Sequence, residues 1–247
     1  MKRSPPPLPD GKVPMRALGP SLGRGAASDP RCILGPGVGL DAAVLDVGGG
    51  RYLVTGTDPI TFAPDELARY AVHVNANDVA VCGARPAWFQ AVLLLPSGGT
   101  RPHEPRALLE ALEDELATLG AVLTGGHTEV VAGLDHPVVV GQMMGTVAKE
   151  AWVSPSGAQA GDALLLAGGV ALEATALVAR EKRGHLKGAG LTEQELDEAA
   201  AYLYDPGISV VRPALAAAAA GAVDAMHDVT EGGGGGAASE RAEAAGR

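Results

Sequence analysis

The chain has 247 residues, 47% of them hydrophobic but only 3% aromatic, so it can bury a core of small aliphatic side chains in one large or two small domains. Its formal net charge of −10, with no Lys/Arg cluster, excludes a nucleic-acid backbone as a partner. Cys32 and Cys82 form no Cys-x-x-Cys pair, and no signal peptide or run of transmembrane length is present, so we expect a cytoplasmic protein without membrane contact.

The first 34 residues predict a flexible segment. Met1–Asp10 is rich in proline, and residues 18–36 are rich in glycine and proline without hydrophobic periodicity. The alternating glycines of Gly35–Gly39 are compatible with two interpretations. Such glycines let backbone N–H groups approach an anion closely, but they are equally typical of a mobile loop.

Residues 35–150 predict an α+β domain. The expected elements are strands at 41–47 and 51–55 joined by a hairpin at Gly48–Gly50, a helix at 64–81, a strand at 87–95, a helix at 104–119, a strand at 121–124, a turn at 125–129 and a strand at 137–147. This order indicates a mainly antiparallel or mixed sheet with flanking helices, in two layers.

A shift to Ser, Pro and Gly near residues 149–160 predicts a domain boundary, followed by a second α/β domain over 160–247. We expect strands at 161–167 and 222–226 and helices at 170–181, 192–203 and 211–220, the second helix beginning with a Thr192–Glu195 capping box. A Gly-rich turn at His227–Gly233 then leads into a helix, or into a low-complexity tail from Gly234 onward. So few strands make a marginal sheet, which suggests a truncated second domain.

The candidate functional residues are polar side chains that lie either inside an apolar helix or at the ends of predicted strands and helices. Asn75, Asn77 and Asp78 lie in an otherwise apolar helix, where polar groups cost stability unless they are paired or bind a ligand. Asp41, Asp58 and Asp228 lie at element ends near Gly-rich turns. Each aspartate alone is an ordinary turn or cap residue. Together they predict a site for Mg²⁺ and phosphate, because Mg²⁺ takes one or two carboxylates plus phosphate oxygens and phosphoryl transfer depends on such positioning.

Other common chemistries find no support. The sequence has no P-loop, no dinucleotide-binding glycine motif after a strand, no Gly-x-Ser-x-Gly elbow and no His-Glu-x-x-His pair. His127 beside Glu129 and His227 beside Asp228 are possible metal ligands. A lone histidine in a loop is more often structural.

Several of these segments, taken in order, resemble the aminoimidazole ribonucleotide (AIR) synthase superfamily, also called PurM-like. The matching segments are Gly39–Ala43, Thr57–Asp58, Val74–Pro86, Thr124–Glu129, Ala160–Asp162 and Asp228–Gly233. The superfamily includes AIR synthase, thiamine-monophosphate kinase, selenophosphate synthetase and the hydrogenase-maturation protein HypE. The resemblance is strongest to HypE and AIR synthase-related proteins.

The resemblance implies a PurM-like N-terminal domain that forms a homodimer through its sheet and binds ATP and Mg²⁺ in a cleft between protomers. Asp41, Asp58, Asp78 and Asp228 would bind the metal ion and Asn77 would support them. Gly125, Gly126 and His127 would lie close to the nucleotide. A HypE-like enzyme would phosphorylate and dehydrate a carbamoyl group on its own C-terminal cysteine, in concert with other hydrogenase-maturation proteins.

Three features depart from the family pattern. Leu40 replaces an acidic residue before Asp41, His127 stands where many members have Asp or Glu, and the sequence ends at Arg247 without the terminal cysteine. The alternatives are therefore AIR synthase or thiamine-monophosphate kinase activity on a small molecule, or a nucleotide-binding dimer without turnover.

Overall fold

The computed structural model describes residues 7–8, 11–13, 15–18, 26–37, 39–230 and 232–246. Residues 1–6, 9–10, 14 and 19–25 of the predicted flexible segment therefore lie outside the described residues, as do Val38 of the glycine-alternating loop and Glu231 of the Gly-rich turn. No helix among the described residues is long and apolar enough to cross a membrane.

A six-stranded mixed sheet forms the base of the molecule, in the order β1-β2-β3-β6-β4-β5. Its strands are β1 (Cys32–Leu34), β2 (Ala43–Asp46), β3 (Arg51–Ile60), β4 (Arg85–Pro96), β5 (Val122–Val131) and β6 (Val138–Ala148). Neighbouring strands pair antiparallel except β4 and β5, which pair parallel. This topology confirms the predicted mixed sheet and the hairpin between β2 and β3.

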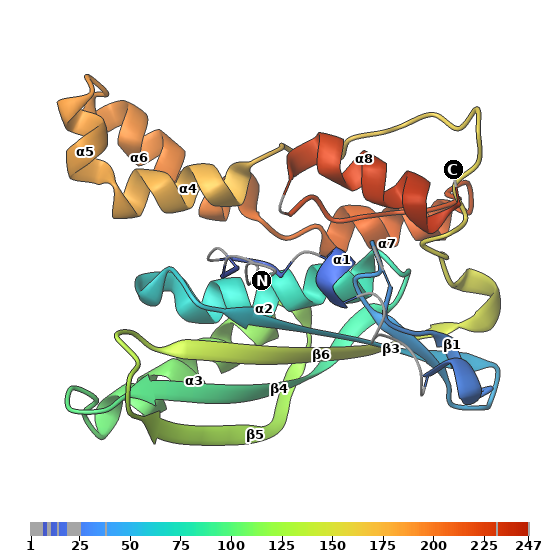
Figure 1. The fold of residues 1–247 in the computed structure, drawn as a ribbon, viewed down its shortest axis with the longest axis horizontal. Helices are drawn as coiled ribbons and strands as arrows, with labels where there is room; N and C mark the ends of the chain where they lie inside the picture. The colour runs from blue at the N-terminus through green and yellow to red at the C-terminus, as the bar shows by residue number, and fades with distance from the viewer. Residues whose placement is uncertain are drawn as a thin grey trace, which may run out of the picture.

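Two helices, α2 (Leu67–Ala80) and α3 (His103–Leu119), confirm the helical periodicity. Alternate residues of β6 are buried beneath the helical layer. Two glycines allow α2 to approach β6 closely: a Cβ on Gly141 would lie 2.5 Å from Asn75 Nδ2, and one on Gly145 would lie 2.9 Å from Val79 Cγ1. Figure 1 shows α2 between the sheet and the C-terminal helices.

The predicted turn at residues 125–129 is wrong, because these residues lie inside β5. Pairing with β4 continues from Trp88–Val122 to Pro96–Val131. Gly125 and Gly126 have φ angles of 153° and 151°, which keep the chain nearly extended where a Gly-Gly pair suggested a reversal. The strand predicted at 121–124 is thus the first part of a longer parallel edge strand.

The C-terminal half is helical. Its helices are α4 (Leu172–Glu181), α5 (Arg183–Gly188), α6 (Glu193–Ala201), α7 (Val211–Ala220) and α8 (Gly233–Ala244), with a shorter helical turn at η5 (Leu203–Gly207). Short helical turns earlier in the chain are α1 (Met15–Leu18), η2 (Ala26–Ser28), η3 (Pro64–Glu66) and η4 (Lys149–Ala151). The Thr192–Glu195 capping box is present. Helix α8 follows the Gly-rich turn, so the prediction of a helix there is confirmed. Helix α5 was not predicted.

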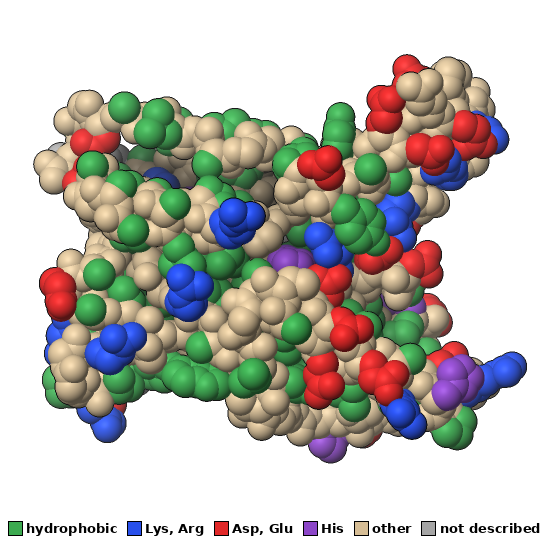
Figure 2. All heavy atoms as spheres, turned by 180° about the vertical axis from the view of Figure 1, so that it is seen from behind, with side chains coloured by type: hydrophobic (Ala, Val, Ile, Leu, Met, Phe, Trp, Pro, Cys, Tyr) green, Lys and Arg blue, Asp and Glu red, His purple; other side chains and the backbone are tan. Residues whose placement is uncertain are grey.

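Helices α4, α5 and α6 form an arm that projects from the body (Figure 1). Charged side chains gather on this arm (Figure 2), where Arg183 pairs with Glu193 and Asp197. The pairs are largely exposed to solvent, so they contribute little to stability.

The two strands predicted in this half are wrong. Residues 161–167 and 222–226 form no strand, because no other described segment pairs with them. Leu164, Leu165 and Leu166 are 82%, 88% and 59% exposed. An apolar run is typical of a buried strand, but it becomes one only where a partner strand satisfies its backbone groups.

Candidate functional site

Four aspartates from separate parts of the chain meet where the two halves join. Asp41 precedes β2, Asp58 lies in β3, Asp78 lies in the last turn of α2, and Asp228 lies between α7 and α8. Asp78 and Asp228 are only 4% and 3% exposed. The charges of the other three aspartates all act on Asp78. The structure therefore assembles the predicted carboxylates, which we call the acidic cluster.

Two features of the N-terminal half position the cluster. The side chain of Asn75 accepts a hydrogen bond from the Asp58 backbone N–H at 2.8 Å and donates to the Asp58 carbonyl at 3.3 Å, which fixes β3 against α2. Gly56 leaves room for Asp78, because a Cβ there would lie 3.0 Å from Asp78 Oδ2. Asn75 is thus a positioning residue that the motif contained but that sequence reasoning gave no separate role.

The acidic cluster is electrostatically unfavourable without a cation. Burial raises the pKa of Asp78 well above its usual value, and the nearby charges of Asp228, Asp58 and Asp41 raise it further. Burial also raises the pKa of Asp228, although contact with His227 opposes that shift. The Oδ2 atoms of Asp78 and Asp228 are buried without a hydrogen-bond partner. A divalent cation would stabilise these carboxylates, so the donor set fits Mg²⁺.

His227 contacts the cluster from the C-terminal half. Its Nδ1 lies 3.0 Å from Asp41 Oδ2 and 3.5 Å from Asp228 Oδ1, and its Nε2 lies 2.8 Å from Glu240 Oε2. Burial alone would lower the pKa of His227, but its contacts with Asp228, Asp41 and Glu240 raise it to about 10. The imidazole therefore balances part of the negative charge when no other cation is bound.

Helix α8 carries two further residues to the cluster. Arg241 Nη2 lies 3.6 Å from Asp41 Oδ2, while Nη1 donates to the carbonyls of Pro155 and Met226 at 3.3 Å each. The approach needs Gly39, whose positive φ of 65° and missing side chain bring the loop before β2 against the backbone of Glu240. Sequence reasoning missed Glu240 and Arg241, because the only signal was a charged pair on a helix of Ala and Gly.

Asn77 has a different role from the aspartates. Its Nδ2 donates to the Ile208 carbonyl at 2.9 Å, and its Oδ1 accepts from the Val210 N–H at 2.8 Å. These hydrogen bonds tie α2 to the segment that leads into α7. Asn77 thus joins the two halves beside the site, and its hydrogen bonds do not reach the aspartates.

The structure places Gly125, Gly126 and His127 away from the cluster. The register runs from Asp58 through Gly141 and Ala91 to Gly126, so three strand spacings, about 14 Å, separate β3 from β5. His127 is largely exposed, with Nε2 3.5 Å from Glu129 Oε2. Within one chain these residues cannot share a ligand atom with the acidic cluster.

A separate hollow of about 310 Å³ lies at the end of the sheet near Pro64, Pro96 and Pro137. Its walls are mostly apolar and contain none of the predicted site residues. The cluster, with its buried unpartnered carboxylate oxygens, is therefore the stronger candidate site.

Comparison with protein families decides the wider assignment. The N-terminal domain of AIR synthase related proteins matches residues 39–147, and the C-terminal domain of the same proteins matches residues 159–247. The chain belongs to the AIR synthase related family. The predicted resemblance is confirmed, and the aspartates of the cluster lie within these two matched regions.

Relatives in this family span several activities. A selenide, water dikinase of Aeromonas salmonicida is 29% identical over 164 residues, 64% of this chain and 46% of that protein. The carbamoyl dehydratase HypE of Cupriavidus necator is 26% identical over 151 residues, 58% of this chain and 43% of that protein. The chain thus spans about half the length of the curated relatives it matches.

Solved structures confirm the PurM-like α+β fold. AaThiL complexed with AMPPCP and TMP has a TM-score of 0.72 at 16% identity, covering 95% of this chain and 73% of that chain. HypE of E. coli, a hydrogenase maturation protein, has a TM-score of 0.65 at 25% identity, covering 93% of this chain and 69% of that chain. The first likeness shows the fold alone.

Proposed function

We propose that this AIR synthase related protein binds ATP with Mg²⁺ at the acidic cluster and phosphorylates a carbonyl or carbamoyl oxygen of its substrate, as a HypE-like enzyme. The observation that carries the proposal is the meeting of Asp41, Asp58, Asp78 and Asp228 with two buried carboxylate oxygens that have no partner. Metal-bound ATP would supply the phosphoryl group that makes the oxygen a better leaving group. The carboxylates would hold the metal ion and so orient the phosphates of ATP, and burial of the cluster would limit access of water to the phosphoryl group.

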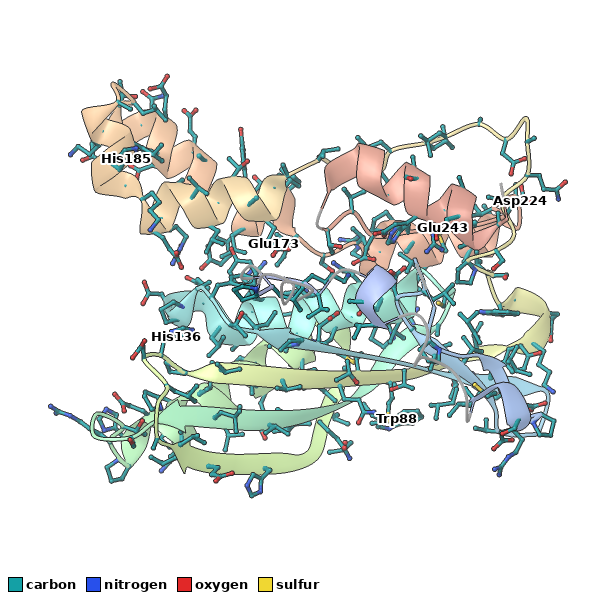
Figure 3. All side chains as sticks on the ribbon, in the orientation of Figure 1. Trp88, His136, Glu173, His185, Asp224 and Glu243 are labelled. Carbon is teal, nitrogen blue, oxygen red and sulfur yellow. The ribbon has the colours of Figure 1, made fainter. Side chains whose placement is uncertain are left out.

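The proposal includes a cytoplasmic homodimer in which the β5 residues Gly125, Gly126 and His127 of one copy approach the nucleotide of the other. The support is the sheet face turned away from α2, on which Trp88 is 41% exposed (Figure 3). Val92, Leu94 and Met144 are partly buried on the same face. A second copy would cover these apolar side chains. By the same HypE likeness we propose other hydrogenase-maturation proteins as further partners.

A second candidate is kinase-type or AIR synthase-type transfer to another small molecule, because the curated relatives include selenide, water dikinases beside HypE. A nucleotide-binding dimer without turnover is the non-enzymatic candidate, and Leu40 in place of an acidic residue favours it. All three share the Mg-ATP site and differ in whether ATP is consumed and in which acceptor receives the phosphoryl group.

Calorimetry with ATP in the presence and absence of Mg²⁺ tests the shared site. We expect Mg-dependent binding that Asp78→Ala weakens by about 100-fold or more, since removing a ligand costs more than disturbing its support. Asp224→Ala, an exposed aspartate outside the cluster, is the matched control (Figure 3). Unchanged ATP affinity in Asp78→Ala would refute the site. Consumption of ATP at saturating Mg-ATP then separates an enzyme from a binding module.

A further inference from the structure

His227 distinguishes the acidic cluster from a magnesium site built of oxygen atoms alone. One ligand atom each from Asp41, His227 and Asp228 lies within 4.8 Å of the others. His227 Nδ1 is 3.0 Å from Asp41 Oδ2 and 3.5 Å from Asp228 Oδ1. Two ligands about 2.1 Å from one metal ion lie about 3.0 Å apart at a right angle and about 3.4 Å apart at a tetrahedral angle. The separations match a shared metal ion.

Unpartnered buried atoms are an independent sign of a ligand. Asp228 is 3% exposed and its Oδ2 has no hydrogen-bond partner. His227 Nδ1 is also buried without a hydrogen bond, although Asp41 Oδ2 is only 3.0 Å away. More than about 90% of buried polar groups are hydrogen-bonded, so two unpartnered atoms on adjacent residues of the cluster need an explanation. A metal ion between them supplies one.

Glu240 holds the imidazole in the orientation that metal binding needs. Its Oε2 lies 2.8 Å from His227 Nε2 and accepts a hydrogen bond from the Nε2–H, which leaves Nδ1 directed at the aspartates. Histidine ligands of metal sites are commonly oriented by a carboxylate in this way. Arg241 is the nearby guanidinium, and one positive charge against four carboxylates leaves the site negative enough for a divalent cation.

We propose that His227 Nδ1, Asp41 and Asp228 bind a first-row transition-metal dication of the Mn²⁺ type in preference to Mg²⁺, with Glu240 as the positioning residue. The inference rests on the metal site of the proposed function and names the class of its metal. Mg²⁺ is a hard ion that favours oxygen ligands, whereas an imidazole nitrogen suits transition metals. The bound ion takes the place of the proton on Nδ1.

The test uses the 247-residue chain in the absence of nucleotide. The probe is added Mn²⁺. We expect Mn²⁺ to bind at least about 10-fold more tightly than Mg²⁺ in calorimetry, and pulsed EPR of the bound Mn²⁺ to show coupling to one ¹⁴N nucleus. His227→Gln should abolish the coupling and weaken Mn²⁺ binding about 10- to 100-fold while changing Mg²⁺ binding little. Glu240→Gln should keep the coupling and weaken Mn²⁺ binding less.

His185→Gln, on the projecting arm, is the control and should leave both ions unchanged (Figure 3). Bound Mn²⁺ without ¹⁴N coupling, or no Mn²⁺ binding, overturns the inference. The wild-type spectrum decides even if His227→Gln fails to fold. Mg-ATP binding without ¹⁴N coupling to Mn²⁺ would refute this inference and leave the proposed function standing. Coupling to ¹⁴N in a protein that binds no ATP would support the metal site and refute the proposed function.

Discussion

The N-terminal and C-terminal halves bury their apolar residues in different ways. Residues 42–147 supply most of the hydrophobic core, whereas the C-terminal half adds a few side chains, such as Leu203 and Val211, that pack onto it. The same half leaves Leu164–Leu166 exposed. The N-terminal half therefore contains most of the buried apolar side chains, and the C-terminal half packs some of its own against that core and against α2. The acidic cluster lies at that contact, so its geometry reports on both halves.

The largest expected difference is between two leucines, one from each half. Leu93 is 0% exposed and Leu165 is 88% exposed. Leu93→Ala should lower the free energy of unfolding by about 2–5 kcal/mol, because it leaves a cavity in the core. Leu165→Ala should change it by less than about 0.5 kcal/mol. Urea unfolding monitored by circular dichroism measures both, and equal losses would contradict the asymmetry.

The hydrogen bonds of Asn77 test the connection between the halves. Asn77→Ala removes the partner of the buried Ile208 carbonyl and of the part-buried Val210 N–H, so we expect the free energy of unfolding to fall by about 3 kcal/mol. Hydrogen exchange should show faster opening of α7 than of the sheet. Gln194→Ala, which removes an exposed contact with Glu198, is the control and should have little effect. An equally fast exchange in β6 would mean that the halves unfold as one unit.

Close packing of α2 on the sheet gives the next effect. A Cβ on Gly145 would lie 2.9 Å from Val79 Cγ1 of α2 and 2.3 Å from the Arg85 carbonyl oxygen of the neighbouring strand β4, so Gly145→Ala should destabilise the chain by about 1–3 kcal/mol. Gly184 in α5 has open space around it, and Gly184→Ala should be neutral or stabilising by up to about 1 kcal/mol. Thermal unfolding of the two variants compares the halves directly; a stable Gly145→Ala protein would disprove the tight contact.

The smallest expected effect is a pH dependence of stability that arises from Glu115, which contacts His73 and Arg69 of α2. The hydrogen bond with His73 lowers the pKa of Glu115, Arg69 lowers it further, and burial opposes both. Because the folded-state pKa lies below the unfolded value near 4.5, Glu115 adds stability above that pH and loses it as pH falls through the folded pKa.

We expect the contribution to be about 1 kcal/mol or less, as the pair is partly exposed. Melting temperatures of the wild type and Glu115→Gln, measured from pH 6 to pH 3, should converge as the solution becomes more acidic. Glu110→Gln, whose carboxylate is exposed on α3, should run parallel to the wild type. Parallel curves for Glu115→Gln as well would refute this assignment.

Local periodicity predicted the N-terminal fold well. The helices near residues 64–81 and 104–119 and the strands that precede them follow from apolar spacing and from Gly120 as a stop signal. The failures depended on partners far along the chain. Gly125–Gly126 became part of a strand because β4 pairs with it, and Leu164–Leu166 stayed out of a strand because no described segment does.

The site was predicted to a similar extent. The aspartates were found because each lies in a short motif, and these motifs follow one another along the chain in the same order as in the AIR synthase superfamily. Asn75 was grouped with Asn77 and Asp78 without its positioning role, and Glu240 was not singled out, because the contacts of Asn75 with Asp58 and of Glu240 with His227 join residues 17 and 13 positions apart. Such pairings arise from packing of β3 on α2 and of α8 on the cluster, which local spacing does not encode.

The most direct test of the central claim is a crystal structure of the chain with Mg²⁺ and a non-hydrolysable ATP analogue. We predict metal density about 2.0–2.1 Å from carboxylate oxygens of both halves, with Asp228 completing a site begun by Asp41, Asp58 and Asp78. Nucleotide bound at the hollow near Pro64, Pro96 and Pro137, with the aspartates free of metal, would contradict the account.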